Sequence, residues 1–67
     1  MNVKVEKVKS YADSARLNIS GNGFDKDLTL SNYQLEDGGL ENRVSQFVEK
    51  FTDKNRDEVV VELGDGF

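Results

Sequence analysis

The sequence predicts a single small α+β domain, in which one helix packs on one face of a four-stranded, mostly antiparallel sheet. Three observations predict it: an apolar stripe of helical spacing, an Asn-Gly pair between two alternating stretches, and two further alternating stretches near the chain ends. The predicted element order is β-β-β-α-β. Because 67 residues have room for one hydrophobic core, we expect one domain over residues 1–67.

The predicted helix is the element around which the other elements are arranged. Its apolar residues are Leu40, Val44, Phe47, Val48 and Phe51, which form one stripe of a helix with 3.6 residues per turn. Polar and charged residues occupy the remaining positions from 41 to 50. A helix of this kind buries its apolar stripe, so the stripe must face the sheet.

A β-hairpin is predicted around Asn22-Gly23. This pair lies between two alternating stretches, residues 15–20 and 24–30, and it suits a type I′ turn, which needs positive φ at both central positions. With the pair at the tip, Leu17 lies opposite Leu28. The apolar residues of both strands then share one face, so the turn and the pattern predict the same register.

The two terminal strands complete the predicted sheet. Val3 and Val5 alternate with charged residues, but Val8 comes one position late, so either the strand ends at Glu6 or a bulge returns Val8 to the inner face. The last strand is expected over Glu58–Leu63. A right-handed crossover through the helix makes it parallel to the third strand, and we favour a position beside the first strand, order 4-1-2-3, over one beside the third.

The predicted core combines the helix stripe with the inward positions of the strands. Its members are Val3, Val5, Ala15, Leu17, Ile19, Leu28, Leu30, Leu40, Val44, Phe47, Val48, Phe51, Val59, Val61 and Leu63. Between hairpin and helix, Ser31 and Gln34 have the spacing of a capping box, which permits a short helical turn outside the predicted element order.

The residue types present argue against catalysis, metal binding and cofactors. Cysteine and histidine are absent, which removes disulfides, thiolate and imidazole ligands and the usual nucleophile–base pairs. The stretch 53–57 begins like a calcium loop but lacks its later glycine and glutamate. Asp25 and Asp27 share one strand face, and we favour a role in solubility and edge protection over magnesium binding or acid–base chemistry. We therefore expect a protein that is not an enzyme, with no metal and no cofactor.

Charge is distributed unevenly along the chain. Residues 1–31 carry five basic and four acidic side chains, whereas residues 32–67 carry four basic and nine acidic ones. An acidic half repels phosphate backbones, so we expect no direct nucleic-acid binding. The longest apolar run is three residues, Val59 to Val61, and the N-terminus lacks a signal-peptide pattern, so we expect a soluble cytoplasmic protein without a membrane partner.

The favoured function is a small non-enzymatic interaction module that docks on a larger protein with a basic surface. One alternative is a phage-type anti-defence inhibitor of a nucleic-acid-handling protein, which would use its acidic half. Another is a structural subunit of a homo-oligomer, in which the partner is a second copy. The expected partner-binding residues are one tyrosine and the acidic positions that core and turns do not need: Tyr33, Glu36, Asp37, Glu41, Glu49, Glu58 and Glu62.

Overall fold

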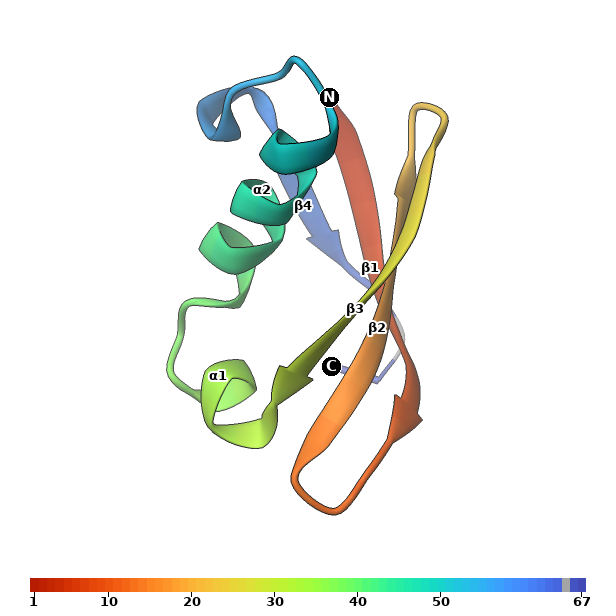
Figure 1. Cartoon of the computed structure of the whole chain (residues 1–67), viewed down its shortest axis with the longest axis vertical. Coiled ribbons are helices and arrows are strands. Elements are labelled where there is room, and N and C mark those ends of the chain that lie inside the picture. Colours follow the sequence, from red (N-terminus) through yellow and green to blue (C-terminus); the bar gives the residue numbers. More distant parts are fainter. Residues whose placement is uncertain (65) are drawn as a thin grey trace.

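The computed structural model describes residues 1–64 and 66–67, and position 65 lies outside the described residues. These residues fold into the predicted α+β architecture (Figure 1). The elements in chain order are β1 (Asn2–Ser10), β2 (Ser14–Gly21), β3 (Phe24–Ser31), α1 (Asn32–Glu36), α2 (Leu40–Phe51), the 3₁₀ turn η1 (Arg56–Glu58) and β4 (Val60–Leu63). None of the helices among the described residues is long and apolar enough to cross a membrane.

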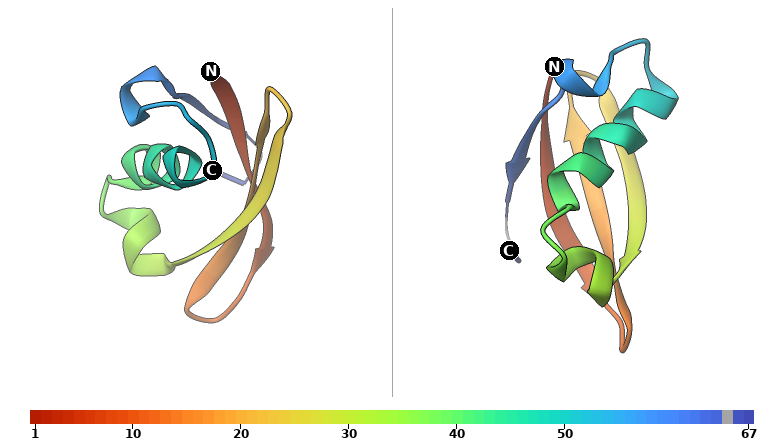
Figure 2. Two further views of the ribbon diagram at one scale, coloured as in Figure 1. Left: turned by 45° about the horizontal axis from the view of Figure 1, so that its top comes forward. Right: turned by 90° about the vertical axis from the view of Figure 1, so that its left-hand side faces the viewer.

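The strands form a mixed four-stranded sheet in the order β3-β2-β1-β4. The pairs β1–β2 and β2–β3 are antiparallel, whereas β1 and β4 are parallel. This is the favoured order 4-1-2-3, so that prediction is confirmed. The α2 helix crosses one face of the sheet obliquely, and within the described residues no helix or strand covers the other face (Figure 2).

The hairpin has the predicted register and turn. Leu17 lies opposite Leu28 and Ala15 opposite Leu30, and Asn22 and Gly23 have φ values of 51° and 82°, as a type I′ turn requires. Gly21, just before the tip, has a φ of 149°, and a Cβ atom there would lie 2.3 Å from the Asn2 carbonyl oxygen. Glycine is therefore required at position 21 as well, because β1 passes too close for a side chain.

Most of the predicted core is buried between α2 and the sheet, but Leu28, Phe47 and Val61 are only partly buried against it, and three further residues differ from the prediction. The buried apolar residues are Val3, Val5, Ala15, Leu17, Ile19, Phe24, Leu30, Leu40, Val44, Val48 and Val59. Phe51 and Leu63 were predicted to be buried but are 53% and 43% exposed, because each is the last residue of its element at the margin of the sheet. Phe24 was not in the predicted core, yet it is 8% exposed.

Two element boundaries differ from the sequence prediction or decide between its alternatives. The β1 strand continues to Ser10 through a bulge between Lys7 and Lys9, which is one of the two alternatives, but Val8 is exposed and does not join the core. The β4 strand begins at Val60 and not at position 58, because η1 precedes it.

The capping box forms and opens the short helix α1. The Gln34 N–H donates to Ser31 Oγ over 3.2 Å, while the Ser31 N–H donates to Gln34 Oε1 over 3.0 Å. These reciprocal bonds satisfy backbone donors that the start of a helix leaves without a partner. They place α1 between the end of β3 and the start of α2.

Candidate functional site

Three phenylalanines join the C-terminal end of α2 to the hairpin tip. Phe47 and Phe51 lie one helical turn apart with ring centroids 5.1 Å from each other. Phe24, the first residue of β3, meets Phe47 edge to face at 6.2 Å and Phe51 at 6.5 Å. These distances and angles are those that aromatic pairs prefer, so the cluster fixes the helix end against β3.

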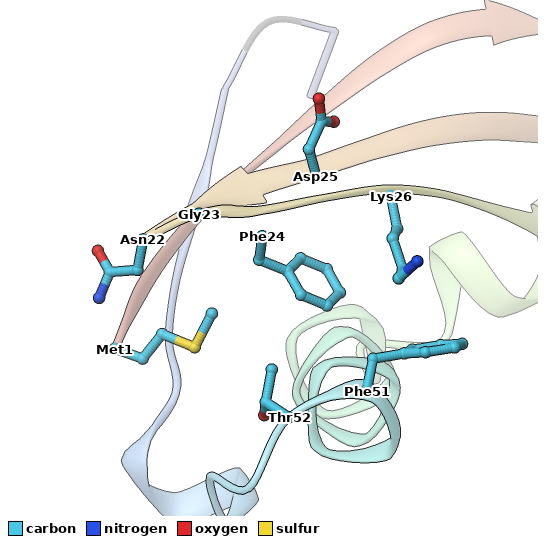
Figure 3. A pocket seen from close by; sticks show the side chains of 8 residues that line it. All are labelled: Met1, Asn22, Gly23, Phe24, Asp25, Lys26, Phe51 and Thr52. Atoms are coloured by element: carbon cyan, nitrogen blue, oxygen red, sulfur yellow. The ribbon is translucent and has the colours of Figure 1, made fainter.

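A pocket of about 330 Å³ opens beside this cluster, and we call it the hairpin-tip pocket. It is lined by Met1, Asn22, Gly23, Phe24, Asp25, Lys26, Phe51 and Thr52. Figure 3 shows Phe24 pointing from β3 toward the helix, with Lys26 above the Phe51 ring. The Lys26 Nζ atom is 4.9 Å from the centre of that ring. The half-exposed Phe51 is therefore covered on one side by a cation.

A second hollow of about 170 Å³ lies farther along the same strand and helix, and we call it the β3–α2 groove. It is lined by Leu28, Leu30, Arg43, Gln46, Phe47 and Lys50. Its apolar residues come from both elements, whereas its two cations come from the helix. Since Phe47 lines the groove and contacts Phe51, the groove and the hairpin-tip pocket share one aromatic wall.

The basic side chains of this region differ in whether an acidic side chain pairs with them. Arg43 pairs with Asp37 at 2.6 Å, and its buried Nε has no hydrogen-bond partner among the described residues. The hydrogen bond from Arg43, followed by the one from the Gly39 N–H, holds the pKa of Asp37 below its ordinary value. Within the described part of the chain, Lys26 and Lys50 form no ion pair. Lys50 therefore brings a positive charge without an ion pair to the groove, and Lys26 brings another to the adjoining hairpin-tip pocket.

The outer edge of β3 presents free backbone groups. The Asn32 N–H donates to the Asp13 carbonyl over 2.9 Å, and this bond fixes the phase of the β2–β3 ladder. Bonded and non-bonded pairs alternate in an antiparallel ladder, so Asp25, Asp27 and Thr29 direct their N–H and C=O groups away from β2. Among the residues described, no strand pairs with this edge.

The side chains of Asp25 and Asp27 lie on the opposite face of the sheet from α2. Asn18 Nδ2 donates to both carboxylates, at 2.8 Å and 3.0 Å, and Arg16 Nε is 3.9 Å from Asp27. Neighbours on β2 thus hold the two carboxylates in place. Groups of three or more potential metal-ligating side chains are not found among residues 1–64 and 66–67.

Four of the sequence-predicted binding residues lie at or near the start of α2. Tyr33 on α1 is 78% exposed, and Glu36 and Glu41 are also exposed. Asp37 has a structural role, because it accepts hydrogen bonds from Arg43 and from the Gly39 N–H. We call Tyr33, Glu36 and Glu41 the α1 acidic surface.

The other three predicted residues lie elsewhere. Glu49 accepts the Arg56 N–H over 2.9 Å at the far end of α2, and Glu58 accepts Asn55 Nδ2 over 3.3 Å in η1. Glu62 lies opposite Lys4 in the β1–β4 register, on the uncovered face of the sheet. The structure therefore distributes the predicted set over several places and does not gather it into one surface.

Sequence reasoning missed the β3–α2 groove, although one signal for it was present. The predicted register already placed Lys26 on the apolar face of the hairpin, where a lysine has no role in a core. That position indicates that the apolar face of the hairpin is open to solvent beside Lys26. Comparisons with protein families, with curated proteins and with solved structures find no match to this chain.

Proposed function

We propose that this protein is a small non-catalytic interaction module that docks on a larger protein through the β3–α2 groove and the adjoining Phe51. The observation that carries the proposal is the 53% exposure of Phe51 at the end of a stripe whose other residues are buried or, in the case of Phe47, partly buried. Large aromatic side chains that are partly exposed beside a hollow are typical anchors of protein interfaces. The neighbouring cations and the open edge of β3 supply the polar contacts that such interfaces combine with an apolar centre.

A matched pair of aromatic substitutions tests the proposal. Phe51→Ser and Tyr33→Ser both remove an exposed aromatic ring, one beside the groove and one on the α1 acidic surface. Affinity capture from the source cell should retain a specific protein with the parent and with Tyr33→Ser, and lose it with Phe51→Ser. Loss with Tyr33→Ser alone would move the docking site to α1. Capture of no specific protein by the folded parent would contradict the function itself.

The acidic positions give the proposal a second, electrostatic part. A partner with a basic surface would be attracted to the α1 acidic surface, which mainly speeds association. Reversal of Glu36 and Glu41 to lysine should slow association at low salt. Asp37 is left unchanged in this variant because it holds Arg43 and the start of α2. An unchanged association rate of the folded variant would remove this surface from the proposal. The compartment we propose is the cytoplasm, and a cysteine-free composition supports it.

A homo-oligomer is the second candidate, because exposed apolar residues also occur at the β4 edge. Val60 and Leu63 are exposed on opposite faces of this edge strand. Exposed apolar residues on an edge strand favour pairing with another strand. Sedimentation over a wide range of protein concentration distinguishes the candidates. A dimer that Val60→Lys dissociates would support the homo-oligomer, whereas a monomer at all concentrations would exclude it.

A further inference from the structure

We infer that the β3–α2 groove binds an extended peptide segment that pairs with β3 as an additional strand. The segment would carry apolar side chains and a carboxylate toward the groove, and basic side chains toward Asp25 and Asp27. This inference rests on the proposed docking function and names the chemical class of its partner. Strand addition to an exposed edge, with pockets for alternate side chains, is a general mode of peptide recognition.

The backbone of β3 is arranged for this pairing. The N–H and C=O groups of Asp25, Asp27 and Thr29 face the open edge, and no strand in the described part of the chain uses them. They recur every second residue, roughly 6.7 Å apart, which is the repeat of a β-ladder. A segment of about five or six residues, the mean length of a strand, would use all three.

The groove side of β3 specifies half of the side chains of such a segment. Along this side the strand presents Lys26, then Leu28, then Leu30. A residue next to Leu28 would contact the apolar lining that includes Phe47. A residue next to Lys26 would lie beside a cation with no carboxylate partner among the described residues. Apolar side chains beside the leucines and a carboxylate near Lys26 fit this order.

The outer side of β3 specifies the other half. Asp25 and Asp27 point to the uncovered face, so the alternate residues of an added strand would lie beside two carboxylates. Lysine or arginine fits there, and acidic residues are disfavoured because like charges on neighbouring strands repel. The β4 strand of a second copy is therefore a poor occupant, since it would add Glu62 to the row of Asp25 and Asp27.

The probe that tests the inference is a displayed library of random linear peptides of about twelve residues, roughly twice the mean strand length. Selection on the folded protein should enrich peptides with alternating chemistry. Every second position, which faces the groove, should be apolar except for one acidic residue. The positions between them, which face Asp25 and Asp27, should be basic. Backbone amide shifts in NMR should change most along β3 and along the groove side of α2.

Two substitutions at Thr29 separate backbone pairing from general affinity. Thr29→Pro removes one outward N–H and places a ring at the open edge, where proline is tolerated in a sheet. Thr29→Ala is the matched control, because it changes the same side chain and keeps the N–H. We expect the proline variant to bind a selected peptide at least about tenfold more weakly than the alanine variant, which corresponds to about 1.4 kcal/mol. Equal binding by the two folded variants would overturn strand addition.

Lys26→Glu keeps the inference testable if Thr29→Pro fails to fold. Selection on this variant should replace the acidic residue at the groove-facing position with a basic one, because the charge beside that position is reversed. An unchanged consensus would contradict the side-chain assignment. Peptides that shift the amides of β4 or α1 and leave β3 unaffected would overturn the site, and so would a selection that yields no binder. If Phe51→Ser loses a captured partner while these results fail, docking stands and strand addition does not.

Discussion

The C-terminal end of α2 is held by aromatic packing, whereas its N-terminal end is held by hydrogen bonds. At the C-terminal end, Phe47 and Phe51 contact Phe24 from the hairpin tip, with ring centroids 5.1–6.5 Å apart. At the N-terminal end, Asp37 accepts hydrogen bonds from the Gly39 N–H at 2.8 Å and from Arg43 at 2.6 Å. The first set joins parts of the chain that are distant in sequence, and the second joins near neighbours.

This difference places most of the stabilising contacts and the proposed docking surface at one end of the helix. The polar contacts at the start of α2 are short in sequence and exposed, so each contributes little to the free energy of unfolding. The aromatic contacts at its end bury a large area and leave Phe51 half exposed beside cations. The same end therefore stabilises the fold and presents the apolar surface that we propose for docking.

The largest expected effect is the loss of the aromatic anchor at the C-terminal end. Phe24→Ala should lower the free energy of unfolding by about 3–5 kcal/mol, because a buried ring and its edge-to-face contact are lost. A domain of this size has roughly that much stability in total, so the variant should be largely unfolded. Circular dichroism and urea denaturation measure this. Phe51→Ala is the control, and because its ring is half exposed it should cost clearly less. Equal midpoints for the two variants would contradict the asymmetry within the cluster.

The next effect concerns Gly21, which allows β1 to pass close to the hairpin. Gly21→Ala should destabilise by about 2–4 kcal/mol, because positive φ costs a residue with a side chain about 1–3 kcal/mol and a clash adds to it. The clash is the approach of the new Cβ to the Asn2 carbonyl oxygen. Gly23→Ala has the same kind of φ but no atom of the described structure within 4 Å, so it should cost less. Urea midpoints in the opposite order would place the close approach at the turn and not beside β1.

A smaller effect is expected from the capping box that opens α1. Ser31→Ala should lower the free energy of unfolding by about 1 kcal/mol, because the Gln34 N–H loses its acceptor. Ser10→Ala at the exposed end of β1 is the control and should be neutral. Urea denaturation of both variants checks the difference. If Ser31→Ala unfolds like the parent, the capping box of α1 contributes nothing measurable to stability.

The smallest effect is a pH dependence that comes from Asp37. Its pKa is below the ordinary value in the folded state, chiefly because of the hydrogen bond from Arg43. It therefore adds stability above the unfolded-state pKa of about 4, and this contribution is lost as the pH falls through the folded-state pKa. Asp37→Asn should flatten the stability profile below about pH 4 and change little at pH 7 beyond the lost ion pair. Parallel stability profiles for parent and variant would show that the pKa of Asp37 is the same in the folded and unfolded states.

The contacts at the two ends also differ in how far the sequence predicts them. The Ser31–Gln34 capping box, the Asn22-Gly23 turn and the bounds of α2 all follow from spacings of a few residues, and the structure has each of them. The sequence also predicts the hairpin register, because a shift of one strand by one residue would turn its apolar side chains to the other face of the sheet. Local backbone chemistry and side-chain periodicity are sufficient for such features.

Only the tertiary structure decided which residues meet at the C-terminal end of α2. Phe24 is buried because the oblique crossing of the helix brings Phe47 over the hairpin tip, and the same crossing leaves Phe51 beside the open edge of β3. The sequence indicates that these residues lie on the apolar faces of the helix and of the hairpin. It does not indicate how far these two faces overlap. Crossing angle and strand length set that overlap, and the overlap determines where a core ends and a binding surface begins.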